Sequence, residues 1–337
     1  MIIVTGAAGM IGSAMVWKLN EMGRNDIIVV DKLRTEEKWL NLRKRDYADW
    51  VDRDELFNWL ANPANAGKIT GVVHMGACSA TTERDGDFLM ENNYGYSKKL
   101  WDFCAARQIP YVYASSAATY GAGELGYNDD VTPEELKKLQ PLNKYGYSKK
   151  IFDDWAFKQS IAPKQWCGLK FFNVYGPQEY HKGRMASMVF HTFNQYRDNG
   201  GVKLFKSHKE GFKDGEQLRD FVYLKDVVDV MYFLLTEKVE SGVYNIGTGE
   251  ARSFLDLSMA TMRAASNNPE LKVEDVVEFI PMPEDLRGRY QYFTQASMEK
   301  LKRTGYTKKF TSLEEGVKDY VQNYLAKEDS YLSLIHI

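Results

Sequence analysis

The sequence predicts an α/β fold in which a doubly wound parallel sheet is joined to a smaller, intertwined C-terminal lobe. In the first half of the chain, short apolar runs rich in β-branched residues alternate with amphipathic stretches, which is typical of parallel strands connected by helices. The chain has 337 residues, 44% of them hydrophobic, which is enough for one large domain or two coupled lobes.

The expected elements follow from this alternation. Strands are expected at residues 2–5, 26–30, 71–74, 110–113 and 165–172, and helices at 11–22, 54–60, 85–107 and 145–159. Beyond residue 172 a loop at 173–184 leads to a helix at 185–197, strands at 219–223 and 243–246 return to the first sheet, and segments 276–283 and 312–325 complete the smaller lobe. The charged stretch 208–218 should be a surface flap, because it buries too little apolar area to offset chain ordering.

Charge and composition exclude several classes of function. Lysine and arginine number 44 against 46 acidic residues, a net charge of −2, so the chain has no basic field for nucleic acid or an anionic membrane. No apolar run approaches the roughly 20 residues that a membrane helix needs. The three cysteines (Cys78, Cys104 and Cys167) form no CxxC pair, and the histidines form no metal-binding spacing. The N-terminus reads as a strand rather than a signal peptide. We therefore expect a cytoplasmic protein without a metal.

A glycine-rich turn closes the first strand and opens the first helix. Gly6 permits a tight turn, Gly9 lets the backbone approach a pyrophosphate, and Gly12 allows close packing of helix on strand. The start of the helix adds unpaired N–H groups for the phosphates. Asp31 ends the next strand, about 20 residues on, where such motifs place an acidic residue. The sequence thus predicts a Rossmann-type dinucleotide site.

The residues alone leave the choice between NAD and NADP open. Asp31 would accept a hydrogen bond from an adenine-ribose hydroxyl, which favours NAD. Three basic residues that follow it could neutralise a ribose phosphate instead, namely Lys32, Lys38 and Arg53.

A tyrosine and a lysine are placed for hydride and proton chemistry. Tyr145 and Lys149 are four residues apart, so they share one face of a helix. A phenol with an ordinary pKa of about 10 needs about 4 kcal/mol of preference for the phenolate to act near pH 7, and an adjacent ammonium helps to supply it. Tyr147 has no lysine four residues on, which favours Tyr145 as the base. Ser116 ends an apolar strand and is expected to hydrogen-bond the reacting oxygen.

With these motifs the chain resembles the extended short-chain dehydrogenase/reductase superfamily. More narrowly, over residues 1–326, it is similar to the family of epimerases that act on ADP-activated heptose. The segments that carry the resemblance are 219–223, 226–227 and 244–249 for the superfamily, and 74–79, 81–83, 115–121, 172–177, 181–187 and 288–291 for the narrower family.

The resemblance implies an activity and a cofactor. Members interconvert the D-glycero and L-glycero forms of an ADP-heptose for lipopolysaccharide, using tightly held NADP, with NAD the less favoured alternative. Lys182 is implied as a second catalytic base beside Tyr145. A homo-oligomer, specifically a pentamer, is also implied.

The resemblance also implies which residues contact each ligand. The cofactor residues are Met10, Ile11, Met75, Gly76, Ala77, Cys78, Ser79, Asn92, Val174, Lys149 and Lys182. The sugar-nucleotide residues are Asn173, Arg184, His191, Phe205, Lys206, Ser207, His208, Arg219 and Tyr290. Two departures bear on this set: Arg184 stands where relatives carry a small residue, and the 208–218 insertion lengthens the approach to Arg219.

The predicted domains follow these roles. Residues 1–172 plus about 218–250 form the dinucleotide-binding domain, about 173–217 plus 251–330 form the substrate-binding lobe, and 331–337 are expected to be an appended, non-native tail.

Other functions remain open at this stage. A different NAD(P)-dependent sugar-nucleotide epimerase or dehydrogenase would carry the same motifs. A dehydratase is disfavoured because Ala117-Ala118 stand where that class has an acid pair. A non-catalytic NADP-binding sensor is disfavoured by the intact Ser116, Tyr145 and Lys149.

Overall fold

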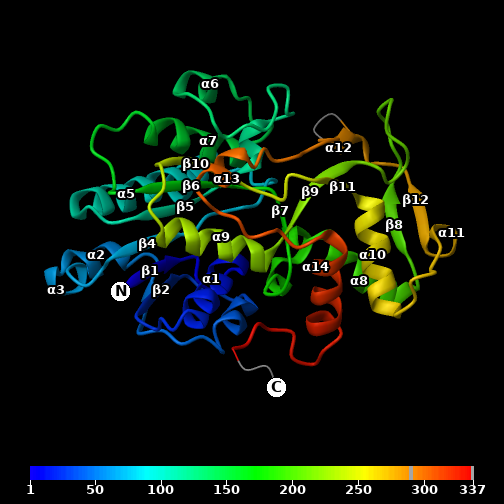
Figure 1. Ribbon diagram of the computed structural model, residues 1–337, viewed down its shortest axis with the longest axis horizontal. Helices are drawn as coiled ribbons and strands as arrows, with labels where there is room; N and C mark the ends of the chain where they lie inside the picture. Colours follow the sequence, from blue (N-terminus) through cyan, green and yellow to red (C-terminus); the bar gives the residue numbers. More distant parts are fainter. Residues whose placement is uncertain (288–290, 335–337) are drawn as a thin grey trace.

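The structure, a computed structural model, describes residues 1–287 and 291–334 and is built around one seven-stranded sheet (Figure 1). Its strands are β1 (Ile2–Thr5), β2 (Ile27–Asp31), β3 (Asp49–Asp52), β4 (Gly71–His74), β5 (Tyr111–Ser116), β6 (Trp166–Phe171) and β10 (Gly242–Ile246). In the order β10-β6-β5-β4-β1-β2-β3, each strand is parallel to its neighbours. The predicted doubly wound parallel sheet is thus confirmed. β3 escaped prediction because, of its four residues, Val51 alone is buried.

The strand order determines where a ligand binds. The chain passes from β1 to β2 and β3 toward one edge, and from β4 to β5 and β6 toward the other. In such sheets the crevice at the carboxyl ends of the strands, where the order reverses, is the usual binding site. This crevice lies between the ends of β1 and β4, beside the end of β5.

Both faces of the sheet are buried under helices. On β1, Ile2 and Val4 pack on the side of α1 (Met10–Glu21) and α9 (Leu224–Thr236), which lie side by side. Ile3 points to the opposite face, toward α5 (Tyr96–Arg107) and α7 (Lys144–Ala156). This alternation along one strand gives two separate apolar cores.

The C-terminal lobe has two small sheets and three main helices. One sheet contains β11 (Ala251–Ser253), β9 (Leu218–Tyr223) and β7 (Asn173–Tyr175), and the other pairs β8 (Val202–Phe205) with β12 (Val277–Ile280). The helices are α8 (Met188–Asn199), α10 (Phe254–Ser266) and α14 (Leu313–Tyr320).

The prediction that residues 219–223 return to the first sheet is wrong. β10 pairs with β6, as predicted for 243–246, and therefore occupies the edge that β9 would have needed. β9 instead lies between β7, to which it is parallel, and β11, to which it is antiparallel. Its Phe221 and Tyr223 are buried against Leu257 of α10 and Val317 of α14, so this strand belongs to the core of the C-terminal lobe.

The remaining helices are short. They are η1 (Glu37–Asn41), α2 (Leu56–Ala61), α3 (Pro63–Ala66), α4 (Gly86–Leu89), η2 (Met90–Gly95), η3 (Ala117–Tyr120), α6 (Pro133–Lys138), η4 (Tyr180–Met185), α11 (Val273–Val276), α12 (Glu284–Arg287), α13 (Glu299–Arg303) and η5 (Val321–Leu325). Among the described residues, no helix is long and apolar enough to cross a membrane.

The stretch between β8 and β9 is a surface loop over part of its length. Residues 208–211 are exposed, as expected of a flap. The end of the stretch nearest β9 is not exposed, because Gln217 is buried and the Gly215 N–H donates to the carbonyl of Phe205 at 3.1 Å. The insertion is therefore anchored at the end of β8 and projects from there.

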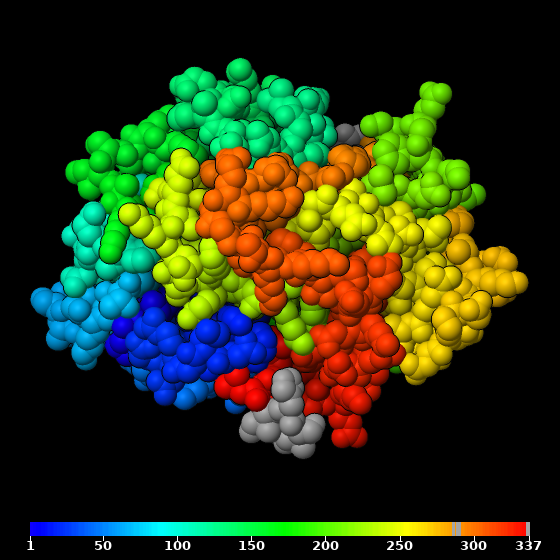
Figure 2. All heavy atoms as spheres, viewed as in Figure 1, coloured from blue at the N-terminus to red at the C-terminus, as the bar shows by residue number. Residues whose placement is uncertain are grey.

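The segment expected to be an appended tail is packed against the fold as far as it is described. Leu332 is buried, its N–H donates to the Gln178 side chain at 3.1 Å, and its carbonyl accepts from Arg45 at 2.8 Å. Trp17 donates to the carbonyl of Ser333 at 3.2 Å. Figure 2 shows this red segment beside the blue N-terminal residues.

Gly12 leaves no room for a side chain, because a Cβ there would lie 2.1 Å from the Gly6 carbonyl oxygen. Gly12→Ala should lower the free energy of unfolding by about 3 kcal/mol, the upper range for overpacking. Urea unfolding measures the loss. Gly95→Ala is the control, since its Cβ would meet the Met90 carbonyl oxygen at an ordinary 3.6 Å. That change should stabilise by roughly 0.5–1 kcal/mol, and equal losses in the two variants would contradict the prediction.

Candidate active site

The glycine turn and the loop after β4 meet at the carboxyl edge of the sheet. Gly6 has φ +62°, and a Cβ on it would lie 2.7 Å from the backbone nitrogen of Gly76. Gly9 is the N-cap residue of α1 and makes no side-chain hydrogen bond to the first N–H groups of that helix. Met10 is buried and Ile11 partly exposed at the start of the helix. The turn therefore fits a dinucleotide pyrophosphate.

Asp31 lies at the end of β2 beside this turn. Its carboxylate accepts from the Ala8 N–H at 2.8 Å and from the Lys32 N–H at 2.7 Å. The same carboxylate pairs with the Lys38 ammonium at 2.9 Å. Asp31 is thus oriented by the backbone and largely neutralised by Lys38.

The other predicted basic residues gather near Asp31. Lys32 pairs with Asp54, which also pairs with Arg53 at 3.1 Å. Arg53 donates in addition to the side-chain oxygen of Asn92. The structure therefore brings Lys32, Arg53 and Asn92 together, with both cations paired to Asp54.

Tyr145 is held in the first turn of α7 by a local cap. The Asn143 side chain accepts from the Gly146 N–H at 2.8 Å, which fixes the start of the helix. The Tyr145 ring is buried, whereas the Tyr147 ring is 54% exposed, in agreement with the choice of Tyr145 as the base. Burial raises the pKa of the Tyr145 phenol, and a hydrogen bond with Ser116 offsets part of that rise.

Ser116 and Lys149 stand next to Tyr145. The Ser116 hydroxyl accepts from the Ala118 N–H at 3.1 Å and so caps η3. The Lys149 ammonium donates to the carbonyl of Ala114 at 2.7 Å. Burial lowers the pKa of Lys149 to about 8. Near pH 7 the lysine therefore carries its charge beside the phenol, the arrangement that proton transfer requires.

Asn93 ties the loop after β4 to the catalytic helix, and the sequence did not point to it. Its side chain accepts from the Cys78 N–H at 2.9 Å and donates to the Cys78 carbonyl at 3.0 Å. It also donates to the Ser148 hydroxyl at 3.0 Å, which donates to the Tyr145 carbonyl at 2.7 Å. The predicted cofactor loop, Met75 to Ser79, is thereby fixed relative to Tyr145.

Lys182 lies on η4, after β7, and its ammonium is 3.9 Å from the sulfur of Met10. This contact places Lys182 beside the start of α1. Burial lowers the pKa of Lys182, and the nearby Glu179 carboxylate opposes the shift. A lysine with a lowered pKa is a better general base near neutral pH. Gly183, with φ +52°, allows the bend that follows it.

The predicted substrate residues are distributed over several elements of the C-terminal lobe. Asn173 is exposed at the start of β7, Arg184 is exposed on η4, and His191 is half-buried on α8. Val174, which was predicted to contact the cofactor, follows Asn173 on β7 and is half-buried. Phe205 ends β8 and is followed by Lys206, Ser207 and His208, while Arg219 is buried on β9. Tyr290 lies outside the described residues.

Three contacts fix part of this group. His208 accepts from the Met282 N–H at 3.1 Å, and its backbone N–H donates to the Tyr292 hydroxyl at 3.0 Å. The Arg219 guanidinium lies 5.6 Å from the centre of the Phe254 ring. His208 is therefore tied to Met282 and Tyr292. Within the described residues, no three His, Cys, Asp or Glu side chains are grouped for a metal ion.

These features define a dinucleotide-dependent enzyme with a Tyr-Lys pair, and the chain belongs to the NAD dependent epimerase/dehydratase family, whose model matches residues 2–247. Within it, the chain is 75% identical over 332 residues to ADP-L-glycero-D-manno-heptose-6-epimerase of Fusobacterium nucleatum subsp. nucleatum, with 98% of this chain and 100% of that protein covered. An enzyme of the same name from Nitratidesulfovibrio vulgaris is 51% identical with the same coverage. The resemblance drawn from the sequence motifs is thus confirmed.

Solved structures agree with this family. The ADP-L-glycero-D-manno-heptose-6-epimerase of Helicobacter pylori matches with a TM-score of 0.74 and 28% identity, over 97% of this chain and 96% of that one. The UDP-glucose 4-epimerase of Thermus thermophilus, solved with NAD, matches with a TM-score of 0.74 and 26% identity, over 95% and 97% of the two chains.

The lowered pKa of Lys149 predicts how stability changes with pH. Between about 8, its pKa in the fold, and its ordinary value of 10.5, the unfolded chain holds a proton that the folded chain has lost. The contribution of Lys149 to stability therefore rises with pH in this window. In dinucleotide-free protein, the stability of Lys149→Met relative to wild type should fall as pH rises from about 7.5 to 9.5.

Urea unfolding at several pH values measures this difference. The exposed Lys158, changed to Met, serves as the control for loss of a lysine on the surface. A stability difference between wild type and Lys149→Met that does not vary with pH would count against burial as the cause.

Proposed function

We propose that this enzyme converts ADP-D-glycero-D-manno-heptose to ADP-L-glycero-D-manno-heptose by inverting carbon 6, with bound NADP, as a step in lipopolysaccharide inner-core synthesis. The observation that carries the proposal is 75% identity, over the full length of the relative, to an enzyme named for this epimerisation. The Tyr145, Lys149 and Ser116 cluster supports it, because these are the groups that such chemistry needs.

The reaction explains why a dinucleotide is required. The C–H bond at a carbon that bears an ordinary secondary alcohol is not acidic, so deprotonation alone does not invert it. A dinucleotide held at the glycine turn would supply the chemistry that is missing from the protein side chains, namely a hydride acceptor whose reduced form is a hydride donor. The protein must therefore remove a proton from the alcohol oxygen and later give one back on the other side.

Three side chains handle this oxygen on one side. Tyr145 takes the alcohol proton, and Ser116 hydrogen-bonds the same oxygen, consistent with the interaction between the two hydroxyls. Lys149 keeps a positive charge next to the phenol and so favours its ionised form.

Lys182 handles the proton on the second side. Its buried ammonium has a lowered pKa and lies against Met10, at the cofactor turn. A second base removes the need for one residue to serve both faces of the carbon. His191, Arg184 and Arg219 are proposed to hold the sugar nucleotide.

The two-base arrangement predicts the effect of two substitutions. Tyr145→Phe and Lys182→Met should each lower the turnover of ADP-heptose by at least about 100-fold, the usual contribution of a general acid–base group. Both variants should still bind NADP. Proton NMR of the epimer composition measures turnover, and fluorescence titration measures binding.

The controls separate this mechanism from a folding defect. The exposed Tyr147, changed to Phe, keeps the ring type and the helix and should leave turnover unchanged. Near-normal turnover in Lys182→Met would remove this lysine from the mechanism. No conversion by the wild-type enzyme, even with added NADP or NAD, would refute the heptose assignment.

NADP is the proposed dinucleotide, although a solved relative is named as a complex with NAD. Lys38 already pairs with Asp31 at 2.9 Å, so the carboxylate that would repel a 2′-phosphate is offset. Lys32 and Arg53 both pair with the neighbouring Asp54, so these three side chains together carry one net positive charge. This charge balance supports a phosphate at the ribose.

Lys38→Met should weaken the binding of NADP about tenfold or more, because a charge-assisted contact contributes roughly 1.5–3 kcal/mol. The affinity for NAD should stay the same or rise, since Asp31 is freed to accept from a ribose hydroxyl. Titration of dinucleotide-free protein with each cofactor gives the two dissociation constants. Lys68→Met at an exposed site is the control, and an equal loss for both cofactors would contradict this role of Lys38.

A further inference from the structure

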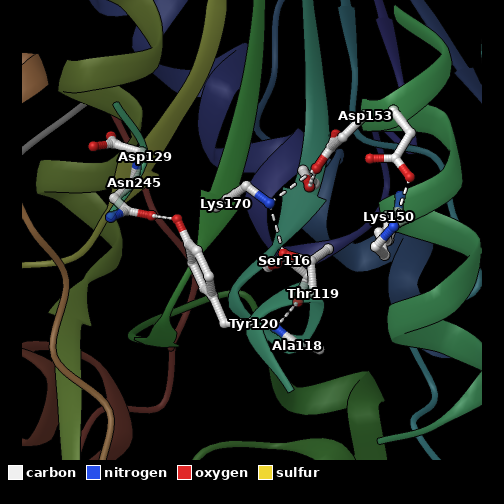
Figure 3. A network of polar contacts seen from close by, with 12 residues as sticks. Ser116, Ala118, Thr119, Tyr120, Asp129, Lys150, Asp153, Lys170 and Asn245 are labelled. Carbon is white, nitrogen blue, oxygen red and sulfur yellow. Dashed lines mark hydrogen bonds and ion pairs between the residues drawn. The ribbon is translucent and has the colours of Figure 1, made fainter. Parts of the chain in front are cut away.

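A fully buried ion pair lies behind the catalytic residues and takes no part in the mechanism so far. Asp153, on α7, and Lys170, on β6, are 3.1 Å apart and 0% exposed (Figure 3). A buried pair is weak evidence for stability, because the cost of desolvating two charges often exceeds their attraction. Its place in the fold indicates another role.

Asp153 fixes how α7 is rotated against the sheet. It follows Lys149 by one turn and Tyr145 by two turns, so the three side chains share one face of the helix. Its carboxylate accepts from the Tyr113 hydroxyl at 3.0 Å and from the Ser115 hydroxyl at 2.7 Å, both on β5. With Lys170, three donors from two strands hold this helix face.

Lys170 carries the connection onward to the turn that bears Ser116. Its ammonium donates to the Thr119 hydroxyl at 2.6 Å, and this hydroxyl donates to the Ser116 carbonyl at 2.8 Å. The ammonium also lies 4.7 Å from the centre of the Tyr120 ring. Figure 3 shows Lys170 linked by dashed lines to Asp153 of the helix and to Thr119 of the turn.

We infer that the chain Asp153–Lys170–Thr119 is a positioning unit, which holds the Ser116 hydroxyl in register with the Tyr145 phenol. This inference rests on the proposed function, since it concerns the two hydroxyls that meet the reacting oxygen. One end of the unit is on the helix of Tyr145, and the other is on the backbone of Ser116. Movement of the helix and of the turn is thereby coupled.

Thr119 is the member whose role can be tested without exposing a buried charge. Thr119→Val keeps the shape of the side chain and removes both hydrogen bonds, while Lys170 keeps its pairing with Asp153. Thr119→Ser retains the hydroxyl that accepts from Lys170 and donates to the Ser116 carbonyl. These two variants separate the hydrogen bonds from the packing.

Turnover of ADP-heptose, its KM and the NADP dissociation constant should be measured for the holoenzyme of both variants. Thr119→Val is expected to lower kcat about tenfold or more, because displacement of reacting groups by about 1 Å costs up to ~100-fold. KM and NADP binding should change less than about twofold, since neither ligand contacts Thr119 in the proposed mechanism. Thr119→Ser should recover most of the rate.

Thr261→Val is the matched control. Thr261 is also 0% exposed, and its hydroxyl donates to the Leu257 carbonyl at 2.8 Å, within α10 of the other lobe. It should lose stability to a similar degree with kcat unchanged. The inference is overturned by a normal kcat in Thr119→Val, by an equal fall in Thr119→Ser, or by an equal fall in Thr261→Val.

The wild-type enzyme in the same series tests the proposed function separately. Should it not act on ADP-heptose, crystal structures of the Thr119 variants still decide the inference. A displaced Ser116 hydroxyl in Thr119→Val, restored in Thr119→Ser, supports the unit, and an undisplaced hydroxyl in both overturns it.

Discussion

The close contact between the turns that follow β1 and β4 is the constraint on which the site depends. A Cβ at Gly6 would lie 2.7 Å from the Gly76 nitrogen, so the turn after β1 does not tolerate a side chain there. The Thr5 hydroxyl, which accepts from the Gly76 N–H at 3.1 Å, is 2.6 Å from the His74 ring. The other ring nitrogen of His74 is 3.0 Å from the Ser97 hydroxyl. Burial lowers the pKa of His74 to about 3, so the ring is neutral and donates one hydrogen bond while accepting the other.

This polar chain continues to the catalytic helix. The Ser97 hydroxyl donates to the Asn93 carbonyl at 2.5 Å, and the Asn93 side chain holds both the Cys78 backbone and Ser148. Ser148 in turn donates to the Tyr145 carbonyl. The cofactor turn and the catalytic tyrosine are therefore joined by a continuous set of buried hydrogen bonds. Such a network is rigid because each unpaired member would carry a desolvation cost.

The sequence predicted the parts of this site that follow from local patterns. The glycine spacing, the four-residue step from Tyr145 to Lys149 and the strand before Ser116 all depend on neighbours in the chain, and the structure places each group as expected. Asn93 and Lys170 act through partners far away in the chain, such as Ser148 for Asn93 at a separation of 55 residues, which no periodicity encodes. A single charge inside an apolar strand, as at Lys170, was a signal that could have been used.

The pairing of β9 was beyond local patterns for a similar reason. The stretch 218–223, which holds Arg219 and Asp220 before three apolar or aromatic residues, is compatible with either sheet. In the structure it pairs with β7, while β10 pairs with β6. That residues 219–223 form a strand was therefore predictable, whereas the strand with which they pair depended on the whole chain. The position of residues 331–334 could not be predicted from local patterns either. Leu332 is held by hydrogen bonds with Gln178 and Arg45, which are far away in the sequence.

The surroundings of Tyr145, the proposed base, do not by themselves favour its ionised form. Burial raises the pKa of the Tyr145 phenol, so the protein fold alone works against its ionisation. Lys149, one helical turn after Tyr145, remains charged near pH 7 because its pKa is lowered only to about 8. A hydrogen bond with Ser116 offsets part of the rise in the pKa of the phenol. Lowering the pKa of a phenol from about 10 to near 7 takes about 4 kcal/mol, more than a single neighbouring charge usually gives. In the proposed mechanism, a cationic nicotinamide bound beside Tyr145 would supply further positive charge and so favour the ionised phenol.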